Sequence, residues 1–273
     1  MLEYDFMRKA LLVGFMLSLM IPTIGVVMVN RRTSMIGDAL SHTSLAGVGL
    51  GLILGINPVI GAIAVCIFAA FSIEKIRKRF PQYGDMATAV IMSTGLGFAA
   101  ILSDFAPGGN TFESYLFGSI SAVTTADVVQ VAVIFVAVIL CGIFYYGGLL
   151  NLSIDPFLAK LSGVNVNFVN GLFTLLSAIT IAISCKIVGA LMVASLIVLP
   201  VTAALMLGRS YKQTYIISVI LGVIYMMSGI TISYYYGLKP GGAIVIIAVA
   251  GMLIAGTYSK VRNGSIIKTK SRK

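Results

Sequence analysis

Long apolar runs separated by short polar or basic segments dominate the chain. A helix needs roughly 20 apolar residues to cross a bilayer, and on that measure the pattern predicts nine membrane-spanning helices. The predicted spans are residues 10–29, 35–55, 58–73, 86–102, 128–146, 166–184, 188–207, 214–234 and 241–258. The pair on either side of Cys185 and Lys186 is also compatible with a re-entrant half-helix, which would leave eight. Because the apolar residues run continuously and do not alternate, membrane β-strands are excluded. The predicted fold is an all-α polytopic membrane protein with eight to nine transmembrane helices.

Composition supports this class. Of 273 residues, 59% are hydrophobic and only 10% are charged, whereas soluble domains carry about 25% charged residues. No segment is long and polar enough to form a separate soluble domain. The sequence therefore predicts one transmembrane domain over residues 1–273, with the lipid bilayer as its surroundings.

The net charge of +10 comes from basic clusters that lie between the apolar runs or at the end of the chain, and no acidic residue follows Asp155. The clusters are residues 31–32, 75–79, 209–212 and the tail 259–273. Short basic loops are typical of the cytoplasmic side of a membrane protein, so the charge indicates topology and not a nucleic-acid partner. With these clusters inside, the N-terminus lies outside, which places Arg8 and Lys9 on the less usual side. The alternative, an N-terminus inside with eight spans, would correct this but would move another loop.

Asp38 and His42, the only histidine, lie within the second predicted span. Ionisable side chains are costly in hydrocarbon and usually face a wet pathway or the bundle interior. At positions i and i+4 the two side chains share one helix face, and carboxylate and imidazole are good ligands for zinc and related metals. The alternative is structural, with Asp38 capping the helix and His42 bonding to a neighbouring carbonyl.

Two ligands make an incomplete zinc site, because zinc prefers four. A twofold axis would double the set, so we hypothesise that the metal site lies between two copies of the chain. Gly47, Gly51 and Gly55 repeat on the same span, and this spacing predicts close approach of another helix.

Residues 151–163 predict a short amphipathic helix on the cytoplasmic side. Asp155 suits its cap, Pro156 its first turn and Gly163 its C-terminal end. Phe157 and Leu161 would be exposed, either as a docking element for a cytosolic partner or as an interfacial helix on the lipid headgroups.

Several chemistries are not supported by the sequence. There is no G-x-x-x-x-G-K-[ST] loop and no H-E-x-x-H motif, which argues against an ATPase or a metalloprotease within this chain. A proton-coupled carrier usually has several buried ionisable residues, and the spans contain few. The three cysteines are far apart, which argues against a disulfide framework; thiol ligation by Cys185 is a minor alternative to simple packing.

The chain resembles the permease subunits of bacterial zinc and manganese ABC importers, the ABC-3 metal-transport permease family. The resemblance covers nearly the whole chain and rests on an ordered set of motifs. They are residues 31–42 (RRTSMIGDALSH) running into 45–51 (LAGVGLG), 116–120 (LFGSI), the segment with Asp155, Pro156, Ala159 and Gly163, and 188–193 (VGALMV) followed by Pro200.

This resemblance implies a helical bundle like that of type II ABC importers in a bacterial cell membrane. It implies three partners: a second copy of the chain, a cytosolic ATP-binding subunit and an extracytoplasmic metal-binding protein. It places Asp38 and His42 at the metal-coordinating positions of the family. The ATPase-docking positions would be Asp155, Pro156, Phe157, Ala159, Leu161 and Gly163.

The expected cargo is Zn²⁺ or Mn²⁺, with no permanently bound cofactor and no enzymatic activity of the chain itself. Residues 43–47 (TSLAG) look closer to the zinc permeases, so zinc is preferred. The alternatives are an ATP-independent metal channel or secondary carrier and, with less support, a membrane enzyme that uses a metal.

Overall fold

The computed structural model describes residues 3–107 and 109–270, and all regular structure within them is helical. The helices are α1 (Asp5–Asn30), α2 (Ser34–Ile53), α3 (Pro58–Arg79), η1 (Pro81–Tyr83), α4 (Gly84–Phe105), α5 (Gly109–Phe117), α6 (Thr125–Phe144), α7 (Tyr146–Ile154), α8 (Pro156–Leu161), α9 (Val166–Ile187), α10 (Ala190–Leu207), α11 (Tyr211–Tyr236) and α12 (Pro240–Lys270). The predicted all-α class is confirmed.

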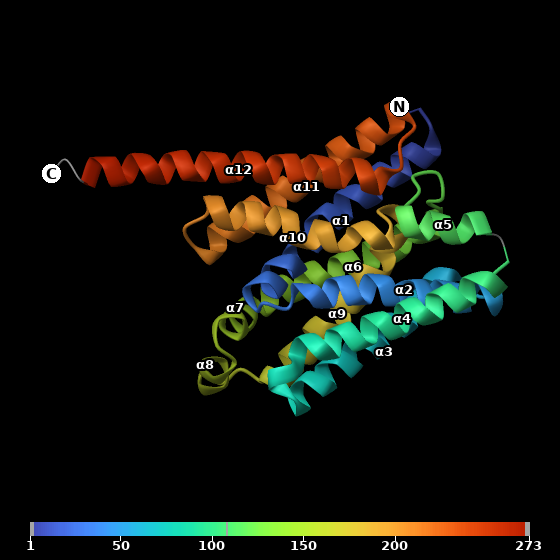
Figure 1. Ribbon diagram of the computed structural model, residues 1–273, viewed down its shortest axis with the longest axis horizontal. Helices are drawn as coiled ribbons and strands as arrows, with labels where there is room; N and C mark the ends of the chain where they lie inside the picture. The colour runs from blue at the N-terminus through green and yellow to red at the C-terminus, as the bar shows by residue number, and fades with distance from the viewer. Residues whose placement is uncertain (1–2, 108, 271–273) are drawn as a thin grey trace.

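Eight helices in the described ranges are long and apolar enough to cross a membrane, namely α1, α3, α4, α6, α9, α10, α11 and α12. The ninth long helix, α2, has 20 residues but is more polar, and it packs against α3, α4, α9 and α10 (Figure 1). The prediction of eight to nine transmembrane helices is therefore confirmed. The α9–α10 pair contains no half-helix, because both members reach spanning length.

The segment between the predicted fourth and fifth spans is more ordered than the sequence suggested. The sequence pattern there resembles a loop, but α4 continues to Phe105, the short helix α5 follows, and α6 already begins at Thr125. With nine residues, α5 is too short to be detected by a search for membrane-spanning runs. For the same reason α7, also of nine residues, was not predicted: it begins where the fifth predicted span ends and includes residues 151–154, which were assigned to the short helix 151–163.

Glycines let α2 and α3 approach closely. A Cβ atom at Gly47 would overlap the backbone of Gly61 and Ala62, and one at Gly51 would lie 2.8 Å from the Cα atom of Pro58. Gly55 does not take part in this packing: it follows the end of α2 with φ of +68° and has no neighbour within 4 Å of a Cβ position. Here the regular spacing was misleading, because Gly55 ends the helix in the left-handed conformation that glycine favours.

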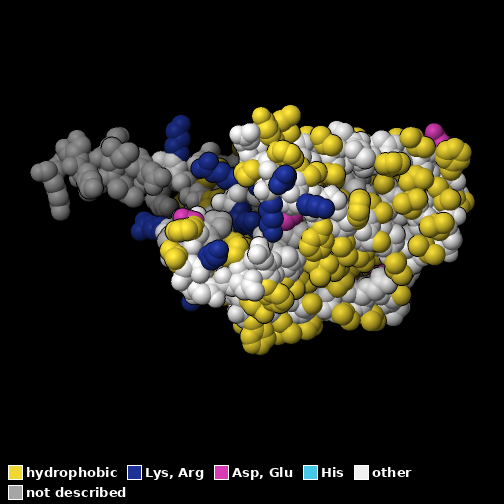
Figure 2. All heavy atoms as spheres, turned by 90° about the horizontal axis from the view of Figure 1, so that it is seen from below, with side chains coloured by type: hydrophobic (Ala, Val, Ile, Leu, Met, Phe, Trp, Pro, Cys, Tyr) yellow, Lys and Arg dark blue, Asp and Glu magenta, His cyan; other side chains and the backbone are white. Residues whose placement is uncertain are grey.

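The basic clusters gather at one end of the bundle. The turn between α1 and α2, the end of α3 and the turn between α10 and α11 all lie at this end, together with α7 and α8 (Figure 1). Lys and Arg side chains are concentrated there, and the opposite half is mostly hydrophobic (Figure 2). This arrangement agrees with one cytoplasmic end. The predicted basic tail, 259–273, is only partly covered: its side chains from 262 onward lie outside what the structure describes.

Replacing Gly47 with alanine tests the α2–α3 contact. We expect Gly47→Ala to destabilise the protein by about 1–3 kcal/mol, because the added methyl group meets backbone atoms that cannot move aside. The measurement is the midpoint of thermal unfolding in detergent. Gly97→Ala is the matched control, since Gly97 lies in α4 with no atom within 4 Å of its Cβ position, and it should unfold at or above the wild-type temperature. Equal midpoints for the two variants would contradict the packing role.

Candidate intramembrane metal site

The helix that carries Asp38 and His42 begins before either residue. Thr33 occupies the N-cap position of α2 without a side-chain hydrogen bond, and Ser34 is the first helical residue. Asp38 therefore lies in the second turn and does not cap the helix. The alternative in which this carboxylate simply starts α2 is wrong.

Asp38 and His42 converge as their spacing predicts. The Nε2 atom of His42 lies 3.5 Å from Oδ1 of Asp38, and the side chains are 18% and 33% exposed, respectively. The Nδ1 atom of His42 is buried and has no hydrogen-bond partner among the described residues. The Asp38 carboxylate and Nε2 of His42 thus face each other, and these are the atoms that a metal ion could bind together.

The face of α2 that carries the pair is open toward one end. Met35, one turn before Asp38, is 59% exposed. Two turns beyond His42, Gly49 lies against Leu102 of α4, where an added Cβ would be 2.9 Å from that side chain. The pair therefore lies at the surface of a single chain, between an open end and an end that α4 covers.

The other polar side chains of α2 are satisfied locally. The hydroxyl groups of Ser41, Thr43 and Ser44 donate to backbone carbonyls of their own helix at 2.6–2.8 Å. Ser44 also lies 3.1 Å from the thiol of Cys185, on a different helix face from Asp38. Cys185 packs there and does not join the pair. Within residues 3–107 and 109–270 there is no group of three or more His, Cys, Asp and Glu side chains that could hold a metal, so Asp38 and His42 stand as a pair without a third such residue beside them.

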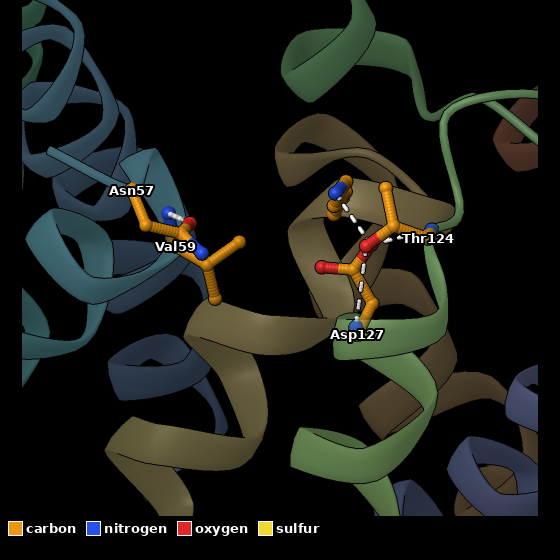
Figure 3. Close-up of polar contacts among 5 residues, drawn as sticks. Asn57, Val59, Thr124 and Asp127 are labelled. Atoms are coloured by element: carbon orange, nitrogen blue, oxygen red, sulfur yellow. Dashed lines mark hydrogen bonds and ion pairs between the residues drawn. The ribbon is translucent and has the colours of Figure 1, made fainter. Parts of the chain in front are cut away.

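A second pair of charged residues was not predicted as a pair. Lys186 at the end of α9 donates to Asp127 of α6 at 2.5 Å, and Asp127 also accepts from the hydroxyl and backbone N–H of Thr124 (Figure 3). Burial raises the pKa of the nearby Tyr115 hydroxyl to about 12, and the Asp127 charge adds to this shift. The two opposite charges neutralise each other, so this pair serves to join helices and leaves no free metal ligand.

Two of the sequence motifs meet in space. Gly118 and Gly189 both have positive φ, of +80° and +94°, and a Cβ on either would overlap the backbone of the other segment. The backbone N–H of Ser119 donates to the carbonyl of Lys186 at 3.3 Å. The segment after α5 thus crosses the α9–α10 turn at close range. A glycine in each motif could have indicated that another backbone passes close by, but sequence alone does not show which two segments meet.

Within the segment 151–163, residues 156–161 form the expected short helix, α8, whereas residues 151–154 belong to the end of α7. The side chain of Asp155 accepts from the backbone N–H of Phe157 at 2.8 Å at the start of α8, and Gly163 ends the turn with φ of +79°. Phe157 and Leu161 are 68% and 70% exposed, whereas Ala159 is buried. Pro156 begins α8, but its side chain lies outside the described residues.

Comparisons with known proteins agree with this architecture. A family model described as the ABC 3 transport family matches residues 3–259. The manganese transport system membrane protein MntC of Listeria monocytogenes is 28% identical, over 95% of this chain and 92% of its own length. The high-affinity zinc uptake system membrane protein ZnuB of Haemophilus influenzae is also 28% identical, over 89% of this chain and 94% of its own length.

A solved structure has the same fold. The structure of PsaBC from Streptococcus pneumoniae in complex with a Fab superposes with a TM-score of 0.84 at 28% identity, covering 95% of this chain and 96% of the matched chain. The family model, the relatives and the fold agree over nearly the full length. The chain therefore belongs to the ABC 3 transport family, as a multi-pass membrane protein of metal transport.

Proposed function

We propose that this chain is the permease subunit of an ATP-driven importer that brings a divalent transition metal into a bacterial cell. The observation that carries the proposal is the Asp38–His42 pair on α2, with its 3.5 Å separation and its unpartnered Nδ1 atom. A carboxylate and an imidazole on an otherwise locally satisfied helix are suited to hold a metal ion briefly. The ion is the cargo, and the chain itself needs no permanently bound cofactor.

Zinc is the preferred cargo and manganese the next. Imidazole favours zinc over manganese, and the general order of affinity does the same. The relatives named for zinc and for manganese are equally similar to this chain, so the preference rests on the ligand chemistry and on residues 43–47.

A second copy of the chain would complete the site. In a bilayer, an aspartate that is 33% exposed would face lipid, which is costly. Two copies of α2 placed face to face would cover both pairs and provide four ligands, the number that zinc prefers.

ATP would be hydrolysed by a separate cytosolic subunit that docks on α8. Helix α8 lies at the basic end of the bundle (Figure 1), and its apolar side chains Phe157 and Leu161 are exposed. An extracytoplasmic binding protein would deliver the metal at the opposite end, and the assembly would lie in the bacterial inner or plasma membrane. Differential contacts of the ATPase with two states of the dimer would bias the site between outward and inward access.

Removing the pair tests the metal site. We expect Asp38→Asn and His42→Ala each to lower metal uptake by about tenfold or more, because each removes a ligand from both copies. The measurement is the zinc, manganese and iron content of cells that have only the variant permease. Asp85→Asn, an exposed aspartate at the start of α4, is the matched control and should leave uptake unchanged. Loss of manganese alone would contradict the zinc preference, and normal content of all three metals would contradict the site.

Cross-linking tests the second copy. Met35 lies on the same face as the pair and is 59% exposed, so Met35→Cys should give a disulfide-linked dimer when membranes are oxidised. Val133→Cys is the control, because Val133 is 64% exposed on α6, a helix that packs against α1, α7 and α9. Only the Met35→Cys product should double in mass on a non-reducing gel. A monomer in both variants would argue against the shared site.

Truncating the exposed side chains of α8 tests docking. We expect Phe157→Ala and Leu161→Ala each to weaken binding of the ATPase by about 2 kcal/mol, roughly 30-fold in affinity, as apolar interface anchors do. Co-purification of the ATPase with the tagged permease is the measurement. Phe105→Ala is the control, because Phe105 is similarly exposed, at 73%, but is the last residue of α4, at the end of the bundle away from α8 (Figure 1). This variant should retain the ATPase. If all three variants retained it, α8 would instead be an interfacial helix.

A further inference from the structure

Three polar side chains from separate helical elements form a chain of hydrogen bonds at the basic end of the bundle. The Nη1 atom of Arg31, at the turn between α1 and α2, donates to Oδ1 of Asn170 on α9 at 2.7 Å. The amide nitrogen of Asn170 donates in turn to Oε1 of Glu74 on α3 at 2.6 Å. One amide thus joins a positive and a negative charge and uses both its donor and its acceptor.

This network is largely removed from water. Asn170 is 3% exposed, and burial lowers the pKa of the Arg31 guanidinium from its ordinary value while the Glu74 carboxylate opposes that shift. Glu74 also lies 3.8 Å from Lys78 on its own helix, whereas Arg31 would lose its compensating charge if Glu74 were removed. The three residues are therefore bound to keep their relative positions.

One end of the network leads to the docking helix. The backbone N–H of Val164 donates to the carbonyl of Ala159 at 3.2 Å, which joins the end of α8 to the segment before α9. Asn165 caps α9 by accepting from the backbone N–H of Phe168 at 3.2 Å. Asn170 follows Asn165 by little more than one helical turn, so a movement of α8 reaches it through a short, bonded path.

The other end leads to the metal-binding helix. Arg32 has a φ of +55°, which is unfavourable for a residue with a Cβ atom and gives the α1–α2 turn a specific shape. The backbone N–H of Thr33 donates to the carbonyl of Met28 at 2.8 Å. Arg31 therefore belongs to a tight turn that ends at Thr33, the N-cap of α2, five residues before Asp38.

We propose that Arg31, Asn170 and Glu74 are positioning residues that carry movement of the ATPase-docking segment to the helix holding Asp38 and His42. This inference rests on the proposed function. It assigns to the network a role in coupling ATP hydrolysis to movement of α2, and not in binding the metal or the ATPase.

Exchanging the amide and the carboxylate provides the test. Asn170→Asp places two carboxylates together without changing the side-chain size, and should lower the number of zinc ions transported per ATP hydrolysed by about fivefold or more. Asn170→Asp/Glu74→Gln restores a carboxylate–amide pair with the roles reversed, and should restore the wild-type ratio. The measurement uses proteoliposomes that contain the permease with its ATPase, with zinc delivered by the binding protein.

Tyr215→Phe is the matched control, because it removes another interhelical contact, 3.1 Å between the hydroxyl groups of Tyr215 and Thr23, away from the start of α2. Its ratio should equal that of the wild type. A purely structural role would reduce protein abundance, hydrolysis and transport together and leave the ratio unchanged, which would overturn the proposal. If Asn170→Asp does not reach the membrane, Glu74→Ala decides, because it removes the acceptor without adding a charge: a lowered ratio supports the coupling role and a wild-type ratio overturns it.

A readout that does not depend on the cargo separates the two proposals. Met35→Cys at the start of α2 can be labelled with a maleimide with and without ATP, and the labelling rate should respond to ATP in the wild-type background but not with Asn170→Asp. A complex that hydrolyses ATP but carries neither zinc nor manganese would overturn the proposed function alone. An equal response of labelling to ATP in both backgrounds would overturn the coupling role alone.

Discussion

The cost of placing polar groups in hydrocarbon determines how this bundle is arranged around α2. An ionisable side chain within a membrane-embedded helix is costly, and α2 carries an aspartate, a histidine and several hydroxyl groups. The hydroxyl groups of Ser41, Thr43 and Ser44 bond to carbonyls of their own helix, which removes their need for other partners. The rest of α2 is enclosed by α3, α4, α9 and α10. The face of Asp38 and His42 stays partly exposed, with side chains 33% and 18% exposed, respectively, and the proposed second copy would cover it.

The opposite side of α2 is closely packed, and a charged pair elsewhere in the bundle is neutralised. Gly47 and Gly51 bring α3 to backbone contact, so α2 is held firmly on the side away from the pair. Lys186 and Asp127 neutralise each other at 2.5 Å and therefore do not compete for a cation. On the proposed function, the ligands left available to a metal ion are Asp38 and His42 on α2.

Features that depend on neighbouring residues in the sequence could be predicted, and contacts between distant segments could not. The spans follow from long apolar runs, α8 from Asp155 and Gly163 at its ends, and the convergence of Asp38 with His42 from their spacing of four. Asp127 and Lys186 are 59 residues apart, and neither has a local feature that identifies the other as its partner. Arg31 and Asn170 are 139 residues apart, and their contact could not be predicted for the same reason. The prediction that Gly55 packs against another helix was wrong for a different reason, since periodicity cannot distinguish a glycine that packs from one that ends a helix.

The position of the pair along α2 limits how far a signal from the cytoplasm has to travel. Asp38 lies four residues beyond the first residue of α2, or about 6 Å along the axis at 1.5 Å per residue, and α2 begins at the same end as α8 (Figure 1). A site at the middle of the bilayer would require a movement to cross half the bundle. On the proposed function, the docking segment, the bonded turn at Arg31 and the two metal ligands all lie near one end, so a rotation of the start of α2 would change how Asp38 and His42 face a second copy. If two copies share four ligands as proposed, any movement that parts the two α2 helices would separate those ligands.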